Sequence, residues 1–378
     1  MNVYINKIEK YLPNEPVTND EMESRLGLVN GKNSISKGLI LRSNQIKTRY
    51  YALDKNGQPT HSNAELAATA IRKLFTGNFS LDNVELLTAG TSSADTIQPS
   101  HALMVHGELG GKRNFEVMSA HGTCNAAMQS LKYAYMSILS SQVSNAVCVG
   151  SETLGSWMHA RNFNSEIDVR NKIEENPYIA FEKDFLRWML SDGAAAMLIQ
   201  NKPNTKGISL QIDWIEVSSF ANELEACMYA GCEKNDDGSL SGWKEMDSEE
   251  RNRVSVLSLK QDARLLQNNI VERGADFLKL LAEKHQLNIN DIDYFLPHLS
   301  SMFFKKKVYE ALEALGMTIP YDKWFLNLSK IGNIGAASAF FMLEELFNSG
   351  KLEKGQKILV MVPESARFSY TFMLLTVV

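Results

Sequence analysis

Two stretches of the chain follow one pattern: NFEVMSAHGTCNAAMQSLKYAYMSIL at residues 114–139 and KWFLNLSKIGNIGAASAFFMLEELF at residues 323–347. In each, an apolar run of strand type leads through a short turn of small residues into a long apolar helix. A strand followed by a helix is the building unit of α/β proteins. Because the unit occurs twice in similar form, an internal duplication is the first hypothesis to test.

The segments before and after these stretches repeat in the same order. The matched pairs are 64–75 and 81–90 with 275–287 and 289–298, and 145–152 with 357–365. Corresponding positions are about 208 to 212 residues apart throughout, a constancy that chance does not favour. We predict a duplicated α/β fold of two halves, each with a mixed sheet, stacked so that helices lie between and outside the sheets.

The predicted halves are residues 1–203 and 204–378, divided near the polar stretch NKPNTKG at 201–207. Residues 221–253 have no counterpart in the first half. They include EKNDDGSLSGWKEMDSEERNR, which is polar and highly charged, so we expect an exposed insertion or cap.

Composition excludes several classes of protein. The chain has 378 residues, is 44% hydrophobic and 22% charged, and carries a formal net charge of −5. A net negative charge does not favour binding to nucleic acid, which is itself negatively charged. No apolar run approaches the length of a membrane span, and the first residues lack a secretory signal pattern. We therefore expect a cytoplasmic protein.

Four cysteines are too few and too unevenly spaced for a disulfide framework. Cys148 lies in the apolar run NAVCVG and is expected in the core. Cys227 and Cys232 lack a second Cys/His pair, so no metal site is predicted there.

Cys124 is different because it follows a small-residue turn and precedes a long helix. At a helix N-terminus, free N–H groups and the macrodipole favour a reactive thiolate. On position alone, a buried structural thiol is also open.

His298 and Asn333 are candidates to join Cys124. His298 ends the apolar run YFLPH, and strand ends are where α/β sheets place ligands, although a capped surface histidine would look the same. Asn333 is the repeat counterpart of Cys124 and could simply cap its helix. Two symmetric corners that converge would bring all three residues into one site.

With these residues in place, the chain resembles the type III β-ketoacyl carrier-protein synthases of the thiolase superfamily over nearly its whole length. The segments that carry the resemblance are TAGTSSADTIQPS (88–100), AHGTC (120–124), SDGAAAML (191–198), PHLSS (297–301) and GNIGAAS (332–338). The resemblance implies the thiolase fold and a catalytic set of Cys124, His298 and Asn333.

The resemblance also implies the chemistry. Cys124 would accept an acyl group from a coenzyme A or acyl-carrier-protein thioester, with no metal and no resident cofactor. His298 and Asn333 would stabilise the enolate of a second thioester, and the backbone N–H groups of Cys124 and Ala366 would form the oxyanion hole. The family is usually homodimeric.

Departures from the family pattern define tentative substrate-binding positions. The family's glycine-rich loop appears as ESARFSY (364–370), which places Arg367 at its mouth. Ser301 and Phe303 replace residues typical of the PHQAN region. Gln98 stands where an aromatic residue closes the acyl pocket in other members, and His121 lies three residues before the nucleophile.

The departures favour a specialised branch, and the ketosynthases that make dialkylresorcinol precursors are the nearest resemblance. Such an enzyme would join an acyl thioester to a β-ketoacyl thioester and close a dialkylcyclohexanedione ring. Alternatives are chain initiation from an acyl-CoA and a malonyl carrier protein, and acyl transfer to oxygen or nitrogen. A non-catalytic partner subunit is disfavoured because all three catalytic positions are retained.

Overall fold

The computed structural model describes residues 1–75, 79–162 and 185–378. Its main sheet has nine strands in the order β13-β14-β15-β8-β1-β7-β6-β4-β5. Their bounds are β1 Tyr4–Tyr11, β4 Leu86–Thr91, β5 Glu116–His121, β6 Asn145–Glu152, β7 Gly193–Gln200, β8 Leu210–Ser219, β13 Tyr294–Pro297, β14 Lys357–Glu364 and β15 Ser369–Val377.

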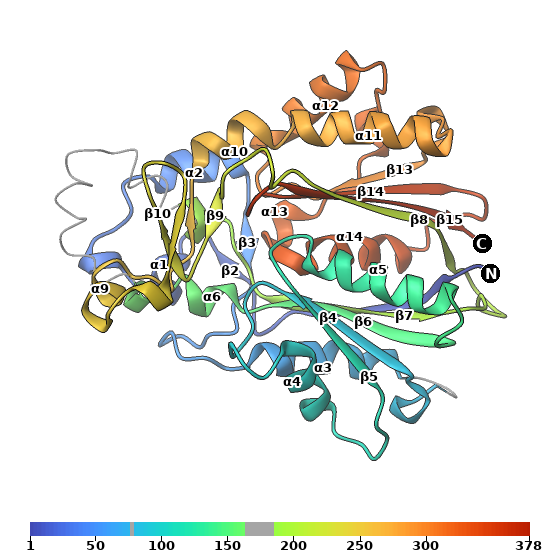
Figure 1. Cartoon of the computed structure of the whole chain (residues 1–378), viewed down its shortest axis with the longest axis horizontal. Coiled ribbons are helices and arrows are strands. Elements are labelled where there is room, and N and C mark those ends of the chain that lie inside the picture. The colour runs from blue at the N-terminus through green and yellow to red at the C-terminus, as the bar shows by residue number, and fades with distance from the viewer. Residues whose placement is uncertain (76–78, 163–184) are drawn as a thin grey trace.

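The sheet folds back on itself and forms two stacked layers (Figure 1). In the described residues, the main sheet passes from one layer to the other where β1 pairs with β8, at Tyr4 with Gln211 and Ile5 with Leu210. Outward from this junction both arms have the same order: two antiparallel pairings, then a parallel one, β6 with β4 and β14 with β13. The predicted duplication therefore appears in the strand topology. The division into residues 1–203 and 204–378 stays a prediction, and it falls in the loop between β7 and β8.

Helices lie between and outside the two layers, as predicted (Figure 1). The long helices are α3 Asn63–Leu74, α4 His101–Leu109, α5 Ala126–Leu139, α11 Glu272–His285, α12 Phe303–Ala314 and α14 Ser338–Phe347. α5 and α14 are central, and their apolar side chains share one buried cluster with strands of both arms. α3 and α4 cover one outer face, and α11 and α12 cover the other. Five layers result, with the core on both sides of each sheet.

Shorter elements complete the described chain. The helices are α1 Met22–Leu26, α2 Lys37–Asn44, α6 Leu154–Trp157, α9 Ser248–Arg253, α10 Ala263–Asn269 and α13 Leu328–Ile331. The strands, all of two or three residues, are β2 Val17–Thr18, β3 Thr48–Arg49, β9 Met228–Tyr229, β10 Cys232–Lys234, β11 Leu240–Gly242 and β12 Lys260–Gln261.

Local sequence accounts for several of these boundaries. α3 begins with a capping box, in which Ser62 accepts from the N–H of Glu65 and the Glu65 carboxylate accepts from the N–H of Ser62. β13 ends at Pro297, as expected for a residue that cannot donate to the ladder. Cys148 is fully buried in β6, which confirms its predicted place in the core.

One predicted strand was wrong. The run before Asn333 was expected to pair like β5, but only Trp324 forms a bridge, with Phe295 of β13. β13 has four residues, whereas β4, the partner of β5, has six. The chain therefore leaves the sheet edge after one pairing and enters α13 at Leu328.

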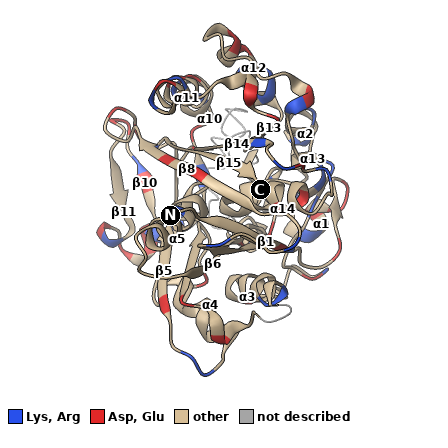
Figure 2. Ribbon diagram, turned by 90° about the vertical axis from the view of Figure 1, so that its right-hand side faces the viewer, with Lys and Arg blue, Asp and Glu red and all other residues tan. Residues whose placement is uncertain are grey.

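The insertion at 221–253 forms a small cap rather than a free loop. It contains the β10–β11 hairpin and α9, and its start is bonded to the loop after β14, since the N–H groups of Cys227 and Met228 donate to the carbonyl of Ala366 at 2.8 and 3.2 Å. Charges of both signs lie on the outer helices α11 and α12 (Figure 2). No helix in the described ranges is long and apolar enough to cross a membrane.

Candidate active site

Cys124 lies in the tight turn between β5, which ends at His121, and α5, which begins at Ala126. The turn packs closely on β4: a Cβ atom added to Gly90 would lie 2.3 Å from the backbone nitrogen of Ala127. Only a glycine lets strand and helix approach this closely. The Cys124 side chain is consequently buried, with 8% of its surface exposed.

The surroundings of Cys124 disfavour a thiolate, contrary to the expectation from its place before a helix. Burial is the main cause that raises the pKa of the Cys124 thiol, and the carboxylates of Glu364 and Glu152 raise it further. One Glu364 oxygen accepts from the N–H groups of Thr123 and Asn125, at 3.0 and 3.1 Å. Backbone donors that could have stabilised a thiolate are thus already engaged by a carboxylate, and the resting residue is a thiol.

His298 follows the end of β13 and is held by its backbone, whose N–H donates to the carbonyl of Met361 at 2.7 Å. Its Nε2 is buried without a hydrogen-bond partner in the described residues. Burial lowers the pKa of the imidazole to about 4. His298 is therefore neutral near pH 7, and its Nε2 is left to meet a group that enters the cavity.

Backbone hydrogen bonds hold Asn333 at both its N–H and its carbonyl group. Its N–H donates to the carbonyl of Met189, and its carbonyl accepts from the N–H of Ser191. The side-chain Oδ1 accepts from the N–H of Gly335 at 3.0 Å and from the hydroxyl of Ser338 at 3.3 Å. With Oδ1 engaged, the Nδ2 amide is the part of the side chain that remains to donate.

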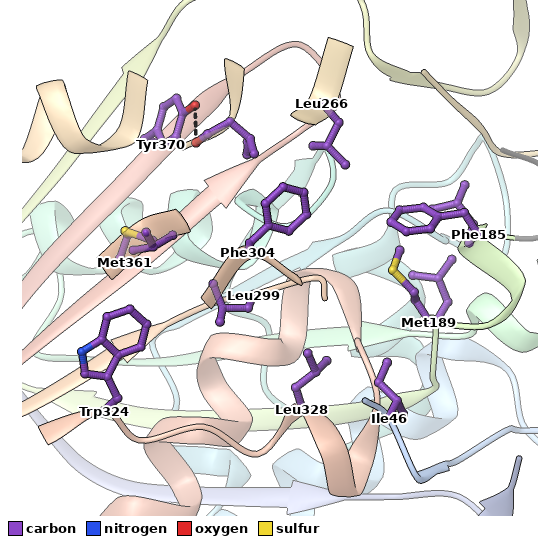
Figure 3. Packing of buried hydrophobic residues seen from close by; sticks show 14 of the residues in the cluster. Ile46, Phe185, Met189, Leu266, Leu299, Phe304, Trp324, Leu328, Met361 and Tyr370 are labelled. Atoms are coloured by element: carbon purple, nitrogen blue, oxygen red, sulfur yellow. Dashed lines mark hydrogen bonds between the residues drawn. The ribbon is translucent and has the colours of Figure 1, made fainter. Parts of the chain in front are cut away.

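Two small cavities meet at Cys124. One, of about 40 Å³, is lined by Cys124 and His298 and by apolar residues of α10, α11 and α12, among them Leu266, Ala275 and Phe304. The other, of about 30 Å³, is lined by Cys124 and Asn333 together with residues such as Met189. Figure 3 shows the packing of Leu266, Leu299, Phe304 and Met189 around this region. Both cavities are small, so an acyl chain requires these apolar side chains to move.

The five residues predicted to bind substrate lie outside both cavities. The side chains of Gln98, His121 and Arg367 are exposed, and Nε of Arg367 donates to the carbonyl of Leu224 in the cap. Phe303 is 40% exposed, whereas Ser301 is fully buried toward Ser43. Their substrate-binding roles stay predictions.

Ala366 also lines neither cavity, and its carbonyl accepts the two N–H groups from the cap. Its place in the oxyanion hole stays a prediction.

Immediate neighbours of these residues line the cavities instead. Ser300 and Ser365 border both cavities, and Phe304 borders the one with His298. Each is one position away from a residue that the family pattern singled out. Motif spacing indicates the loop, but the direction of a side chain at a strand end or a first helical turn depends on local dihedral angles. Met228, Leu259 and Gln261 come from the cap or the chain just after it, which has no counterpart in the repeat.

The low pKa of His298 makes a testable prediction about stability. A histidine whose pKa is about 4 when folded and 6.5 otherwise takes up its proton more readily in the unfolded chain. This term favours folding above pH 6.5 and is lost as the pH falls toward 4. Between about pH 7 and about pH 5, the wild type should lose about 2 kcal/mol of unfolding free energy more than His298→Gln.

Urea denaturation of both proteins at the two pH values measures this difference. His121→Gln, which changes an exposed histidine, is the control and should follow the wild type. Equal losses in wild type and His298→Gln would show that His298 is not held neutral by the fold.

Comparison with known proteins identifies a condensing acyltransferase. A model described as 3-oxoacyl-[acyl-carrier-protein (ACP)] synthase III C terminal matches residues 282–374. Residues 282–374 thus match the C-terminal part of the 3-oxoacyl-[acyl-carrier-protein] synthase III family, and nearly the whole chain is similar to members of that family.

Particular relatives agree along nearly the whole chain. The β-ketoacyl-[acyl-carrier-protein] synthase III of Clostridium perfringens is 24% identical over 351 residues, 93% of this chain and 92% of the relative. Among solved structures, AbyA1, a tetronic acid condensing enzyme, has a TM-score of 0.76 at 18% identity and covers 99% of both chains. OleA of Xanthomonas campestris, with bound lauric acid and lauroyl-CoA, has a TM-score of 0.73 at 18% identity and covers 100% of this chain and 99% of its own. These structures establish the thiolase fold.

Proposed function

We propose that the protein forms a carbon–carbon bond between an acyl thioester and a β-ketoacyl thioester through an acyl-Cys124 intermediate, and closes the product to a dialkylcyclohexanedione. The proposal rests on the position of Cys124. It lines one cavity together with His298 and a second cavity together with Asn333. An acyl group on its sulfur would therefore lie between two side chains that can donate hydrogen bonds.

The first half-reaction transfers the acyl group. The sulfur of Cys124 attacks the thioester carbonyl, its proton passes to the departing thiolate, and free coenzyme A or carrier-protein thiol leaves. Because the resting residue is a thiol, a base must accept its proton as the bond forms. The neutral imidazole of His298, in the same cavity, is the group suited to this.

The second half-reaction forms the bond. The β-ketoacyl thioester passes a proton from the carbon between its carbonyls to the neutral imidazole of His298, and hydrogen bonds from His298 Nε2 and Asn333 Nδ2 stabilise the resulting enolate. Its carbon attacks the acyl carbonyl, and the Cys124 thiolate leaves and is reprotonated. Backbone N–H groups at Cys124 and Ala366 form the oxyanion hole in this proposal. For ring closure, a second carbanion of the joined chain attacks the remaining thioester carbonyl, a carbon–carbon bond replaces the carbon–sulfur bond, and the carrier thiol leaves with the proton.

Two kinds of relative support different products. AbyA1 is a tetronic acid condensing enzyme, and tetronic acid is a ring compound, which favours ring formation. The curated relatives are β-ketoacyl-[acyl-carrier-protein] synthases III, which favours the second candidate: chain initiation from an acyl-CoA and a malonyl carrier protein. Acyl transfer to oxygen or nitrogen is less favoured because Asn333, which serves an enolate, is retained.

The deciding experiment supplies acyl-CoA and β-ketoacyl thioesters, separately and together, and follows protein mass and small-molecule products. A cyclised diketone formed only from the pair supports the proposal. An acyl-enzyme that reacts with a malonyl thioester but not with a β-ketoacyl thioester would replace it with chain initiation. An ester or an amide product would indicate acyl transfer to oxygen or nitrogen.

We also propose that the enzyme is a homodimer joined at β5, takes its acyl groups from an acyl carrier protein or coenzyme A, and works in the cytoplasm. β5 is the last strand of the sheet, and α4 and α5 both contact it. Exposed apolar side chains lie on these helices and on the loop before α4: Ile97, Leu103, Tyr133, Met136 and Leu139. A partly exposed edge strand flanked by apolar side chains is suited to pairing with a second copy.

The dimer is tested with Met136→Glu, since Met136 is 55% exposed on α5. We expect the wild type to scatter light as a dimer at micromolar concentration and the variant to dissociate, because the interface would bury a carboxylate. Leu280→Glu, at the 62% exposed residue on α11, is the matched control and should stay dimeric. A monomeric wild type would contradict the proposal.

A further inference from the structure

Two buried glutamates occupy equivalent places in the two halves. Glu152 ends β6 and Glu364 ends β14, and these strands correspond in the duplicated topology. Their side chains are almost wholly buried, with residue exposures of 0% and 9%. A buried carboxylate is costly unless hydrogen-bonded, so both need partners.

Each glutamate accepts at least one hydrogen bond from the other half. Glu152 accepts from the N–H of Ala336 at 3.0 Å, three residues after Asn333. Glu364 accepts from the N–H groups of Thr123 and Asn125, the two residues on either side of Cys124. Each half thus uses the end of one strand to hold the helix start that carries a predicted catalytic residue of the other.

The two glutamates differ in the hydrogen bonds that their carboxylates accept from their own half. Glu152 also accepts from the backbone and hydroxyl groups of Ser92 and Ser93 and from the hydroxyl of Thr91. In the described residues, the Glu364 carboxylate accepts from the N–H groups of Thr123 and Asn125. The cysteine turn is further tied to the same strand pair, because Asn125 Nδ2 donates to the hydroxyl of Ser369, the first residue of β15.

We propose that Glu364 is a positioning residue for Cys124: its carboxylate fixes the backbone on both sides of the nucleophile and places a negative charge against the sulfur. The inference rests on the proposed role of Cys124 as acyl acceptor. It deepens that role, because the thiol keeps its proton until a substrate thioester is bound and His298 accepts the proton. A thiol held in this state resists alkylation and oxidation while the site is empty.

The titratable groups around the thiol come from three elements: the carboxylates of Glu364 from β14 and Glu152 from β6, and the neutral imidazole of His298 after β13. The remaining residues that line the two cavities do not titrate. Glu364 is the larger of the two carboxylate influences on the thiol, and burial is the largest influence of all. Removing the Glu364 charge should therefore lower the pKa of the thiol, and removing the Glu152 charge should lower it less.

The test is the pH dependence of Cys124 alkylation by iodoacetamide, located by peptide mass, in wild type, Glu364→Gln, Glu364→Asp and Glu152→Gln. The midpoint for Glu364→Gln should fall by about one pH unit or more, which raises the alkylation rate at a fixed lower pH roughly tenfold. Glu364→Asp keeps the charge and should stay near the wild type, and Glu152→Gln should lie between. Thermal unfolding identifies any variant that has lost its fold.

An unchanged midpoint in folded Glu364→Gln would overturn the proposal. So would an equal shift in Glu364→Asp, because packing and not charge would then control the thiol. The assay uses no acyl substrate, so its outcome is independent of which condensation the enzyme catalyses. A shifted midpoint in a protein that never loads an acyl group would leave the Glu364 inference standing and refute the proposed function.

Discussion

Replacing Cys124 with alanine should abolish acyl loading and lower condensation by a thousandfold or more, on the order of losses seen when a covalent nucleophile is removed. The variant should fold, because the lost sulfur borders two small cavities and its removal leaves no buried polar group of the described residues without a hydrogen-bond partner. Intact-protein mass after incubation with acyl-CoA measures loading, and product formation measures condensation.

Cys148→Ala is the matched control, since Cys148 is also a buried free thiol but lies within β6. Its sulfur contacts the Ser130 hydroxyl at 3.2 Å, away from the two cavities. This variant should load normally. An acyl adduct that persists in Cys124→Ala and maps to a different residue would remove Cys124 from the mechanism.

Changing Asn333 should separate the two half-reactions. Asn333→Asp keeps an oxygen for the Gly335 N–H and the Ser338 hydroxyl but removes the Nδ2 donor. We expect Cys124 to load at close to the wild-type rate while condensation falls roughly a hundred- to a thousandfold, the usual cost of one lost oxyanion donor. Acyl-enzyme should therefore accumulate, visible by mass in single-turnover experiments.

Asn333→Ala gives a second test without a new carboxylate beside Glu152. It leaves the Gly335 and Ser338 donors without Oδ1, so about 1–3 kcal/mol of stability should be lost as well. Asn327→Ala is the control in the same loop: this buried residue has an Nδ2 with no partner in the described chain, and it lines neither cavity. If loading and condensation fall together in both Asn333 variants, Asn333 serves the fold or acylation and not the enolate.

The architecture can be predicted from patterns along the chain. Apolar periodicity identifies strands and helices, and the constant offset between them shows a duplication, from which stacked sheets with central helices follow. Small-residue turns before the two central helices mark Cys124 and Asn333. Strand ends mark His298. Local pattern and repeat symmetry thus indicate the three candidates, and the resemblance to a known family implies their catalytic roles.

The surroundings of those three residues, in contrast, depend on how the two halves pack in the tertiary structure. Glu364 is 240 positions from Cys124 along the chain, and its carboxylate reaches the cysteine turn because the two halves stack. That contact reverses the expectation of a thiolate, which considered one helix terminus in isolation. The choice of Ser300, Phe304 and Ser365 over their neighbours depends on side-chain direction at strand and helix ends.

Period and spacing are properties of consecutive residues, so they can be read along the chain. Burial, charge and cavity shape arise from residues of both halves and of the cap. They exist only once the duplicated sheets have closed on each other, and for that reason the sequence predicted the three central residues of the site but not their electrostatic setting.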